Sequence, residues 1–318
     1  MTPPLLEFGV EPGGEILSKI KVFNESPETV SLYASTANFT AKDETGSPFF
    51  LFDEQEGLAS WIEIAPNVIV LLPGERQDIP FSIKVPEEAD SGGHYAGIFF
   101  GSSPDIKQEE NQVAIVSKLG ILLLLRVSGD ITSESAIQDF HILNDQNFFT
   151  RLPVQFLYRL RNAGNVHIRP KGVIEIKNIL GISGVEIEAN PVDGVVLPSS
   201  IRRFEPIWQK SEPNEIDYKN FFQNFISQAV AEYKNFAFGR YTAALKLLNV
   251  PESLLVEKIS FWVFPWHFLL TLIIALALVF WILAVIISRY NRWIINKALR
   301  LAQGKQKLGT DNKNKNGE

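Results

Sequence analysis

Short segments in which apolar and polar residues alternate run through the first 260 residues of the chain. They are separated by Pro, Gly and Asn, and examples are "ILSKIKVFN", "TVSLYAS", "QDIPFSIKVP" and "HYAGIFFGS". Because the side chains of a strand point alternately to its two faces, this pattern predicts strands with one buried face. Many short strands divided by turn residues are typical of β-sandwiches, so we expect an all-β fold here.

Three sequence features occur twice in the same order, which indicates an internal repeat. The first is a strand that ends in an Asn turn, the second is a Pro turn followed by a basic residue, and the third is a Gly-x-Tyr before an apolar strand. We therefore predict two tandem Ig-like β-sandwich domains, residues 1–129 and 130–260, and expect each Tyr to pack in its core as at a tyrosine corner. The residue pairs are Asn24 and Asn162, Pro73 and Pro198, and Tyr95 and Tyr241.

The second domain carries an insertion near residues 205–238 that has a helical pattern. Its apolar residues follow one face of a helix, and Asp217 is expected to cap the N-terminus. We expect this face to pack on the sandwich; the alternatives are a helix that docks a partner protein and a helix on the outer membrane surface. The candidate partner-binding residues on it are Phe221, Phe222 and Phe225.

A long apolar segment near the C-terminus predicts one transmembrane helix, which we place at 261–288. Phe268–Ser288 holds no charged residue over 21 positions, and as a helix it would extend about 30 Å, the thickness of the hydrocarbon layer. A buried core helix of this length would carry a polar face. Aromatic residues at both ends suit the membrane interface, and they are Trp266, Tyr290 and Trp293.

The chain from residue 289 to 318 is a short basic tail. It holds eight Lys or Arg, among them Arg289 and Arg292, against two acidic residues. The excess of positive charge predicts a cytoplasmic tail and residues 1–260 outside a plasma membrane crossed once. This orientation needs an export signal, and "MTPPLLEFGVEPGG" lacks the features of one, so we expect the signal to be missing from this sequence. The alternative is the reverse topology.

Charge and residue usage limit the chemistry that we expect. The net charge is −6 and the tail contributes +6, so the first 288 residues carry −12, which argues against nucleic acid as a partner. The chain has no Cys, and its four His show no zinc-binding spacing. No phosphate-binding loop, dinucleotide motif or nucleophile motif occurs. We therefore expect a non-enzymatic protein without metal or cofactor.

The stretch "RNAGNVHIRPKG", Arg161–Gly172, is the second copy of the Asn turn. Its Asn and Gly residues are those expected in a tight turn. In the following strand Val166 and Ile168 point to one face, and His167 and Arg169 to the other. We expect an exposed His167, and if the outer face binds a partner, then His167, Arg169 and Lys171 would form one basic row on an acidic body.

The first domain resembles the DUF916 type, the peptidoglycan-binding domain of WxL-interacting surface proteins of Gram-positive bacteria. The resemblance covers about 125 residues and is carried by "FGVEPGGE", "KVFNESPETVSLYASTANFT", "WIEI", "VLLPGERQDIPFSIKVP" and "GGHYAGIFFG". The second domain resembles the Ig-like domain that follows in such proteins. This resemblance implies a surface protein that contacts cell-wall polymer and other surface proteins.

Three functions are therefore compared. The first is a membrane-anchored surface adhesin or scaffold, bound to the lipid bilayer and displaying two sandwiches to cell-wall polymer or another surface protein. The second is a tail-anchored cytoplasmic adaptor, because both domains are also similar to pilus chaperones and sperm-protein-like domains. The third is an accessory subunit of a membrane complex that uses the helix of the insertion. We expect the first.

Overall fold

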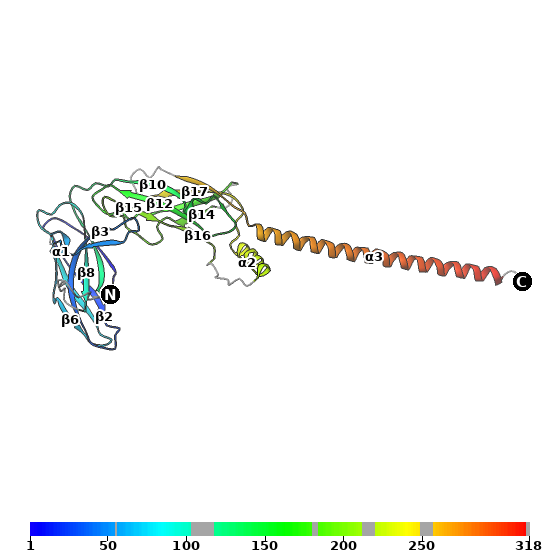
Figure 1. Ribbon diagram of the computed structural model, residues 1–318, viewed down its shortest axis with the longest axis horizontal. Helices are drawn as coiled ribbons and strands as arrows, with labels where there is room; N and C mark the ends of the chain where they lie inside the picture. The colour runs from blue at the N-terminus through cyan, green and yellow to red at the C-terminus, as the bar shows by residue number, and fades with distance from the viewer. Residues whose placement is uncertain (55, 103–117, 180–183, 212–219, 249–256, 316–318) are drawn as a thin grey trace. The chain divides into compact units, whose positions relative to one another are not determined.

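The computed structural model describes residues 1–54, 56–102, 118–179, 184–211, 220–248 and 257–315. The chain divides into two compact units (Figure 1). The body unit consists of Met1–Asn147, Val154–Trp208 and Arg240–Phe261, and it holds both sandwiches. The helical unit consists of Phe148–Pro153, Gln209–Gly239 and Trp262–Glu318. Each unit is described by itself below.

The first sandwich, blue to cyan in Figure 1, has a large and a small sheet. The large sheet has the order β1-β9-β8-β3-β4, with β6 also paired to β3, and the small sheet has the order β2-β7-β5. Strand β1 pairs with β9 in parallel, and the other pairs are antiparallel. The elements are β1 Leu5–Val10, β2 Glu15–Phe23, β3 Val30–Ala41, β4 Pro48–Leu51, α1 Leu58–Trp61, β5 Ile62–Ile64, β6 Val68–Leu71, β7 Arg76–Lys84, β8 Gly92–Gly101 and β9 Lys118–Val127.

The second sandwich follows the same plan with two sheets. One has the order β10-β12-β15, with β16 also paired to β12, and the other contains β18-β17-β13-β14. The chain is thus all-β with one apolar C-terminal helix, and the predicted fold class is confirmed. The elements are β10 Ser135–Ile142, the 3₁₀ turn η1 Leu143–Asp145, β12 Val154–Asn162, β13 Gly172–Asn178, β14 Val185–Glu188, β15 Ser200–Phe204, β16 Ile207–Trp208, β17 Gly239–Leu247 and β18 Lys258–Val263.

Alternation along the strands builds the two cores. In β7, Ile79, Phe81 and Ile83 are buried, whereas Pro80 and Ser82 between them lie on the opposite face. Full burial of such a side chain stabilises the fold by roughly 1.5–3 kcal/mol, so a slip of one residue in register would expose the whole set. In β7 the alternation therefore decides which face of the small sheet is inside.

Two buried Asn side chains explain why the Asn turn and the Pro turn recur together. In the first sandwich, Nδ2 of Asn24 donates to the carbonyls of Leu71 and Leu72, 3.1 Å away in each case, next to Pro73. In the second, Nδ2 of Asn162 donates to the carbonyl of Val196 at 3.0 Å, two residues before Pro198. Each Asn thus links the end of one strand to a distant turn.

The same two side chains also shape their own turns. Oδ1 of Asn24 accepts the N–H of Ser26 at 3.0 Å, and Oδ1 of Asn162 accepts the N–H of Gly164 at 3.0 Å. Each Nδ2 also donates to the carbonyl four residues on, that of Glu28 or of Val166. A buried polar group without partners destabilises the fold. Because each of these amides has several hydrogen-bond partners, it stabilises its turn instead.

The two Tyr of the repeat do not occupy equivalent places. Tyr241 is 7% exposed and its ring contacts Trp208 and Phe261 in the second core. In β8 the core residues include Ala96 and Ile98, so Tyr95 lies on the opposite face of the sheet, outside the first core. The tyrosine-corner prediction is therefore wrong for Tyr95, because the repeat is shifted by one residue at this strand.

The helical unit contains the helix of the insertion and the C-terminal helix. Helix α2 spans Phe221–Lys234 and α3 spans Trp266–Lys315, while the short strand β11, Phe148–Phe149, pairs with the last residues of β18. Asn220 is the N-cap of α2 and forms no side-chain cap bond; Asp217, the predicted cap, lies outside the described residues.

Helix α3 is long and apolar enough to cross a membrane over residues Trp266–Lys297. The predicted start of the span at residue 261 is wrong, because Phe261–Val263 belongs to strand β18. The buried Phe261 and Val263 flank the half-exposed Trp262, and this alternation is that of a strand.

Candidate functional site

The hairpin Arg161–Gly172 is a joint between the two sandwiches of the body unit. The side-chain amide of Asn165 donates to the backbone carbonyl of Asp130 at 2.8 Å. The backbone carbonyl of Asn165 accepts the N–H of Gly93, also at 2.8 Å. Gly92 has φ of +128°, and a Cβ there would lie 2.7 Å from the carbonyl oxygen of Asn165. Only glycine suits that position, so the close approach of the two backbones is built into the sequence.

The two basic residues of the predicted outward row face the first sandwich instead. His167 Nδ1 lies 3.3 Å from the hydroxyl of Tyr95, and Nε2 lies 3.8 Å from Glu7. Arg169 forms ion pairs with Glu7 and, at 2.9 Å, with Asp193. The His167 side chain is 16% exposed, so the prediction of an exposed His167 is wrong. The strand does place both side chains on one face, but that face is covered.

Lys171 is exposed. Its carbonyl accepts the N–H of Leu248 at 2.7 Å, at the end of β17. The structure therefore does not bring His167, Arg169 and Lys171 together as a free basic row.

The contact at His167 makes the stability of the body unit depend on pH. Burial lowers the pKa of His167 below its ordinary 6.5; nearby Glu7 opposes this, and Arg169 and Arg126 add to it. As the pH falls below about 6.5, the unfolded chain therefore takes up a proton before the folded protein does, and stability is lost. We expect the unfolding midpoint of the wild type to fall more between pH 7 and pH 5 than that of His167→Gln.

The control for this experiment is the exposed Asn67, because Asn67→Ala removes no titratable group. Asn67→Ala should show the same pH dependence as the wild type when unfolding is followed by circular dichroism at each pH. Equal pH slopes for the wild type and His167→Gln would show that His167 does not couple the two sandwiches to pH.

A second contact joins the β3–β4 hairpin to the second sandwich. Both carboxylate oxygens of Glu44 accept hydrogen bonds from Arg159, one of them at 2.9 Å from Nε, and its carbonyl accepts the N–H of Arg203 at 2.6 Å. Gly46 has φ of +81° and lies against the guanidinium of Arg202, where a Cβ would be 2.3 Å from Cζ. The hairpin needs this glycine both for its backbone and for the space.

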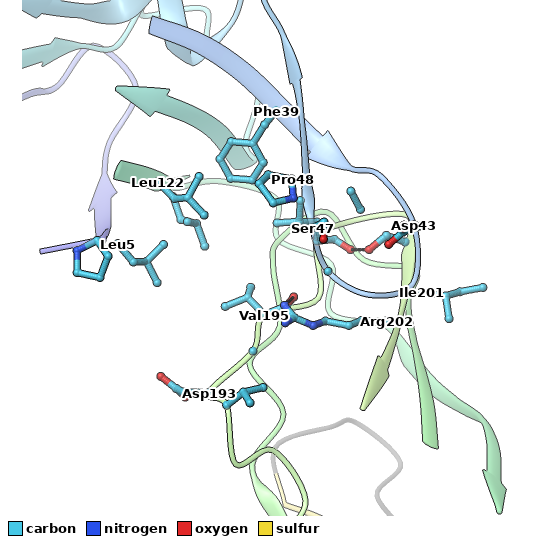
Figure 2. A pocket seen from close by; sticks show the side chains of 18 residues that line it. Leu5, Phe39, Asp43, Ser47, Pro48, Leu122, Asp193, Val195, Ile201 and Arg202 are labelled. Atoms are coloured by element: carbon cyan, nitrogen blue, oxygen red, sulfur yellow. Dashed lines mark hydrogen bonds between the residues drawn. The ribbon is translucent and has the colours of Figure 1, made fainter. Parts of the chain in front are cut away.

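Between these two contacts lies a cavity of about 300 Å³ in the body unit (Figure 2). Phe39, Pro48 and Leu122 line it from the first sandwich, and Val195 and Arg202 line it from the second. Its floor is the outer face of the large sheet, where Leu124 is only 2% exposed. Most of the lining side chains are apolar, as is usual for binding pockets, and a few polar groups converge on it.

Arg202 is the cationic group of this cavity. Its Nη1 donates to the carbonyl of Val195 at 2.7 Å, and its guanidinium lies 5.5 Å from the ring of Phe204. Its Nε is buried and has no hydrogen-bond partner among the described residues. Burial lowers the pKa of Arg202, although guanidinium remains charged at neutral pH.

The cavity offers apolar walls and one fixed cation, so it can hold an apolar group that carries a hydrogen-bond acceptor. Within the ranges that the structure describes, no group of three or more His, Cys, Asp or Glu could hold a metal ion. Sequence reasoning missed the cavity, because its walls come from segments that are up to 198 residues apart, Pro4 and Arg202.

The predicted membrane-interface residues lie in two places along α3, one at its start and one further along. Trp266, 42% exposed, stacks on His267 at 3.7 Å in the first turn. Tyr290 and Trp293 contact each other further along, beside the exposed Arg289 and Arg292. Trp266 and Tyr290 are separated by about 36 Å along the helix axis, slightly more than the hydrocarbon layer.

The predicted partner-binding residues on α2 are split between two faces. Phe221 and Phe222 are 79% and 77% exposed, whereas the ring of Phe225 contacts Trp266 and His267 at the start of α3. The prediction that one apolar face packs inside is therefore wrong. Sequence reasoning also missed Glu232, which is fully buried and lies 2.6 Å from Nδ1 of His267.

No protein-family model and no curated protein matches this chain in sequence. Among solved structures, it is similar to the class 5 fimbriae chaperone CfaA, with 12% identity, a TM-score of 0.37, and 83% of this chain and 98% of that chain covered. It is also similar to the CsuC–CsuE chaperone–tip adhesion subunit complex of Acinetobacter baumannii, with 10% identity, a TM-score of 0.33, and 80% and 94% covered.

A further similarity is to PapD-like domain 7 of human CEP192, with 16% identity, a TM-score of 0.27, and 40% of this chain and 82% of that chain covered. At these identities and TM-scores, the similarities carry no information about the activity or partners of this chain. The resemblance to the DUF916 type stays a prediction.

Proposed function

We propose that this protein is a non-enzymatic, membrane-anchored surface protein whose two Ig-like sandwiches bind another surface protein. In this proposal α3 crosses the plasma membrane once, residues 1–260 lie outside and the basic tail lies in the cytoplasm. The positive charge after the apolar segment supports this orientation. Cell-wall polymer remains the alternative ligand that the DUF916 resemblance implies.

The observation that carries the proposal is the apolar cavity between the sandwiches. Its volume of about 300 Å³ can take one or two apolar side chains of a protein segment. Arg202 lines the cavity and adds the positive charge of its guanidinium, which would attract an acceptor such as a carboxylate or backbone carbonyl. A polymer of hydroxylated sugars would bring more polar groups than this apolar lining can pair.

The proposed function is tested by cross-linking in intact cells. A photoreactive phenylalanine is placed at Val195 in the cavity wall, and at Leu17, which is 77% exposed on β2, as a matched control. We expect a cross-linked protein adduct from the Val195 position and none from the Leu17 position. We also expect Arg202→Met to reduce the adduct, since it keeps the apolar length and removes the donors.

Three outcomes would contradict parts of the proposal. Equal adducts from both positions would mean that the cavity is not the binding site. Retention on isolated cell wall but not on wall-free beads, without a protein adduct, would favour the polymer. Protection of residues 1–260 from protease added to intact cells would favour the cytoplasmic adaptor.

A further inference from the structure

On helix α2 the apolar side faces outward, whereas on a surface helix of a soluble domain the polar side does. The stripe that faces outward is apolar, and it comprises Phe222 at 77% exposure, Ile226 at 58%, Val230 at 46% and Tyr233 at 65%. These residues follow helical spacing and so lie on one side of α2. Exposure of such an apolar stripe to water is unfavourable. The arrangement therefore indicates that an apolar medium, and not water, covers the stripe. We call these four residues the outer stripe.

The inward side of α2 carries polar residues that bond within the helical unit, beside Phe225 and the buried Ala229. Asn224, Gln228 and Glu232 are spaced four residues apart, and Gln228 donates to Asn224 at 3.4 Å and accepts from Arg151 at 2.5 Å. Glu232 Oε1 lies 2.6 Å from His267 Nδ1, and Oε2 accepts the N–H of Phe268 at 2.8 Å. The carboxylate of α2 therefore caps the first turn of α3, where the helix dipole favours negative charge.

The outer stripe continues into the apolar surface of α3. The ring of Tyr233 lies 5.6 Å from that of Phe268, and the half-exposed Phe236 contacts Phe268 as well. Phe268 is followed along α3 by exposed apolar residues such as Leu270 and Ile273. The two surfaces thus form one apolar area at the end where α3 begins. Aromatic residues are enriched in membrane proteins where a transmembrane helix enters the lipid, at the membrane–water interface.

We infer that α2 is an interfacial membrane helix, with the outer stripe inserted among the lipids of the leaflet that α3 enters. Its partner is a lipid surface, and the capping of α3 by Glu232 holds it at that depth. An interfacial helix buries its apolar face about 5–10 Å into the boundary between head groups and acyl chains. The usual basic polar face is not needed here, because the polar side of α2 is paired within the protein. This inference rests on the membrane anchor of the proposed function.

The absence of Cys from the chain allows a direct test with single cysteines. Val230→Cys in the outer stripe, Leu278→Cys in the middle of α3, and Leu17→Cys on the body unit are each labelled with bimane in the full chain. The protein is placed in phosphatidylcholine nanodiscs whose lipids carry a nitroxide either near the head group or near the end of the acyl chain. Leu17 is the matched control, since it is also an exposed apolar residue.

We expect the label at Val230 to lose fluorescence mainly with the shallow nitroxide. The label at Leu278 should be quenched mainly by the deep nitroxide, and that at Leu17 by neither. If Leu278 is quenched and Val230 behaves like Leu17, then α2 is not in the lipid, whereas the anchor stands. If Leu278 is not quenched at all, the membrane anchor fails and this inference fails with it. Cross-linking of residue 230 to a protein in place of quenching would also overturn the lipid assignment.

A pair of substitutions separates lipid contact from folding. Phe222→Asp lies on the exposed stripe and should leave α2 folded while reducing shallow quenching at Val230→Cys. Phe225→Asp lies against Trp266 and His267 and should instead detach α2, which amide hydrogen exchange would report. Unchanged quenching in Phe222→Asp with α2 still protected would contradict the inference.

Discussion

Asn162→Ala is expected to lower the free energy of unfolding of the body unit by about 3 kcal/mol. Its side chain is fully buried and donates to the carbonyls of Val166 and Val196, at 2.7 and 3.0 Å, while it accepts the N–H of Gly164. Removing it breaks three hydrogen bonds to the backbone, each worth about 0.5–1.5 kcal/mol net. The carbonyl of Val196 keeps the N–H of Ile168 and the N–H of Gly164 keeps the carbonyl of Glu134, whereas the carbonyl of Val166 loses its partner. Urea unfolding of the full chain in nanodiscs, or hydrogen exchange in β12, would measure the loss.

The matched experiment is Asn24→Ala in the first sandwich, where the corresponding side chain makes the same kind of bonds. A similar loss is expected there, because both Asn join a strand end to the turn before a Pro. Asn162→Asp keeps the acceptor but removes the two N–H donors, so it should be at least as harmful. The exposed Asn67 is the control, and Asn67→Ala should change the stability by less than about 0.5 kcal/mol. A comparable small effect at Asn162 would show that the amide network is not required.

Glu232→Ala is expected to release α2 from the start of α3. The carboxylate is fully buried and contacts both His267 and the N–H of Phe268. Its removal leaves the ring nitrogen of His267 and the N–H of Phe268 without this partner, and a buried group left unpaired costs about 1–3 kcal/mol. Amides of α2 should then exchange with solvent on the order of 100-fold faster, if they open locally.

Glu232→Gln is the conservative variant for this position. It keeps an oxygen for the N–H of Phe268 and removes the negative charge that faces His267, so the exchange of α2 should rise less than in Glu232→Ala. Glu186→Ala, at an exposed position of β14, should leave the exchange of α2 unchanged. If α2 exchanges at the wild-type rate in Glu232→Ala, the carboxylate does not hold the two helices together.

The fold was predictable from local pattern because its main determinants are local. The alternation in β7 and the uncharged run after Phe268 each specify an element and its apolar side, whatever the rest of the chain does. The recurring Asn and Pro turns predicted two related sandwiches. The structure adds the reason for their pairing, since Asn24 and Asn162 bond to the carbonyls near those turns.

The pattern of apolar and polar residues could not decide which part of the protein covers a given face of a strand or helix. The period of a strand places His167 and Arg169 on one side, but only the packing of the body unit shows that Glu7 and Tyr95 cover that side. The cavity at Arg202 depends in the same way on segments far apart in the chain.

The helix α2 shows the same division between local and tertiary information. Its sequence determined a helix with an apolar stripe, because hydrophobic spacing follows from the helical repeat. Whether that stripe faces a core or a different medium depends on where the polar residues find partners. Glu232 finds His267 and the first turn of α3, and this contact between distant residues turns the apolar stripe outward.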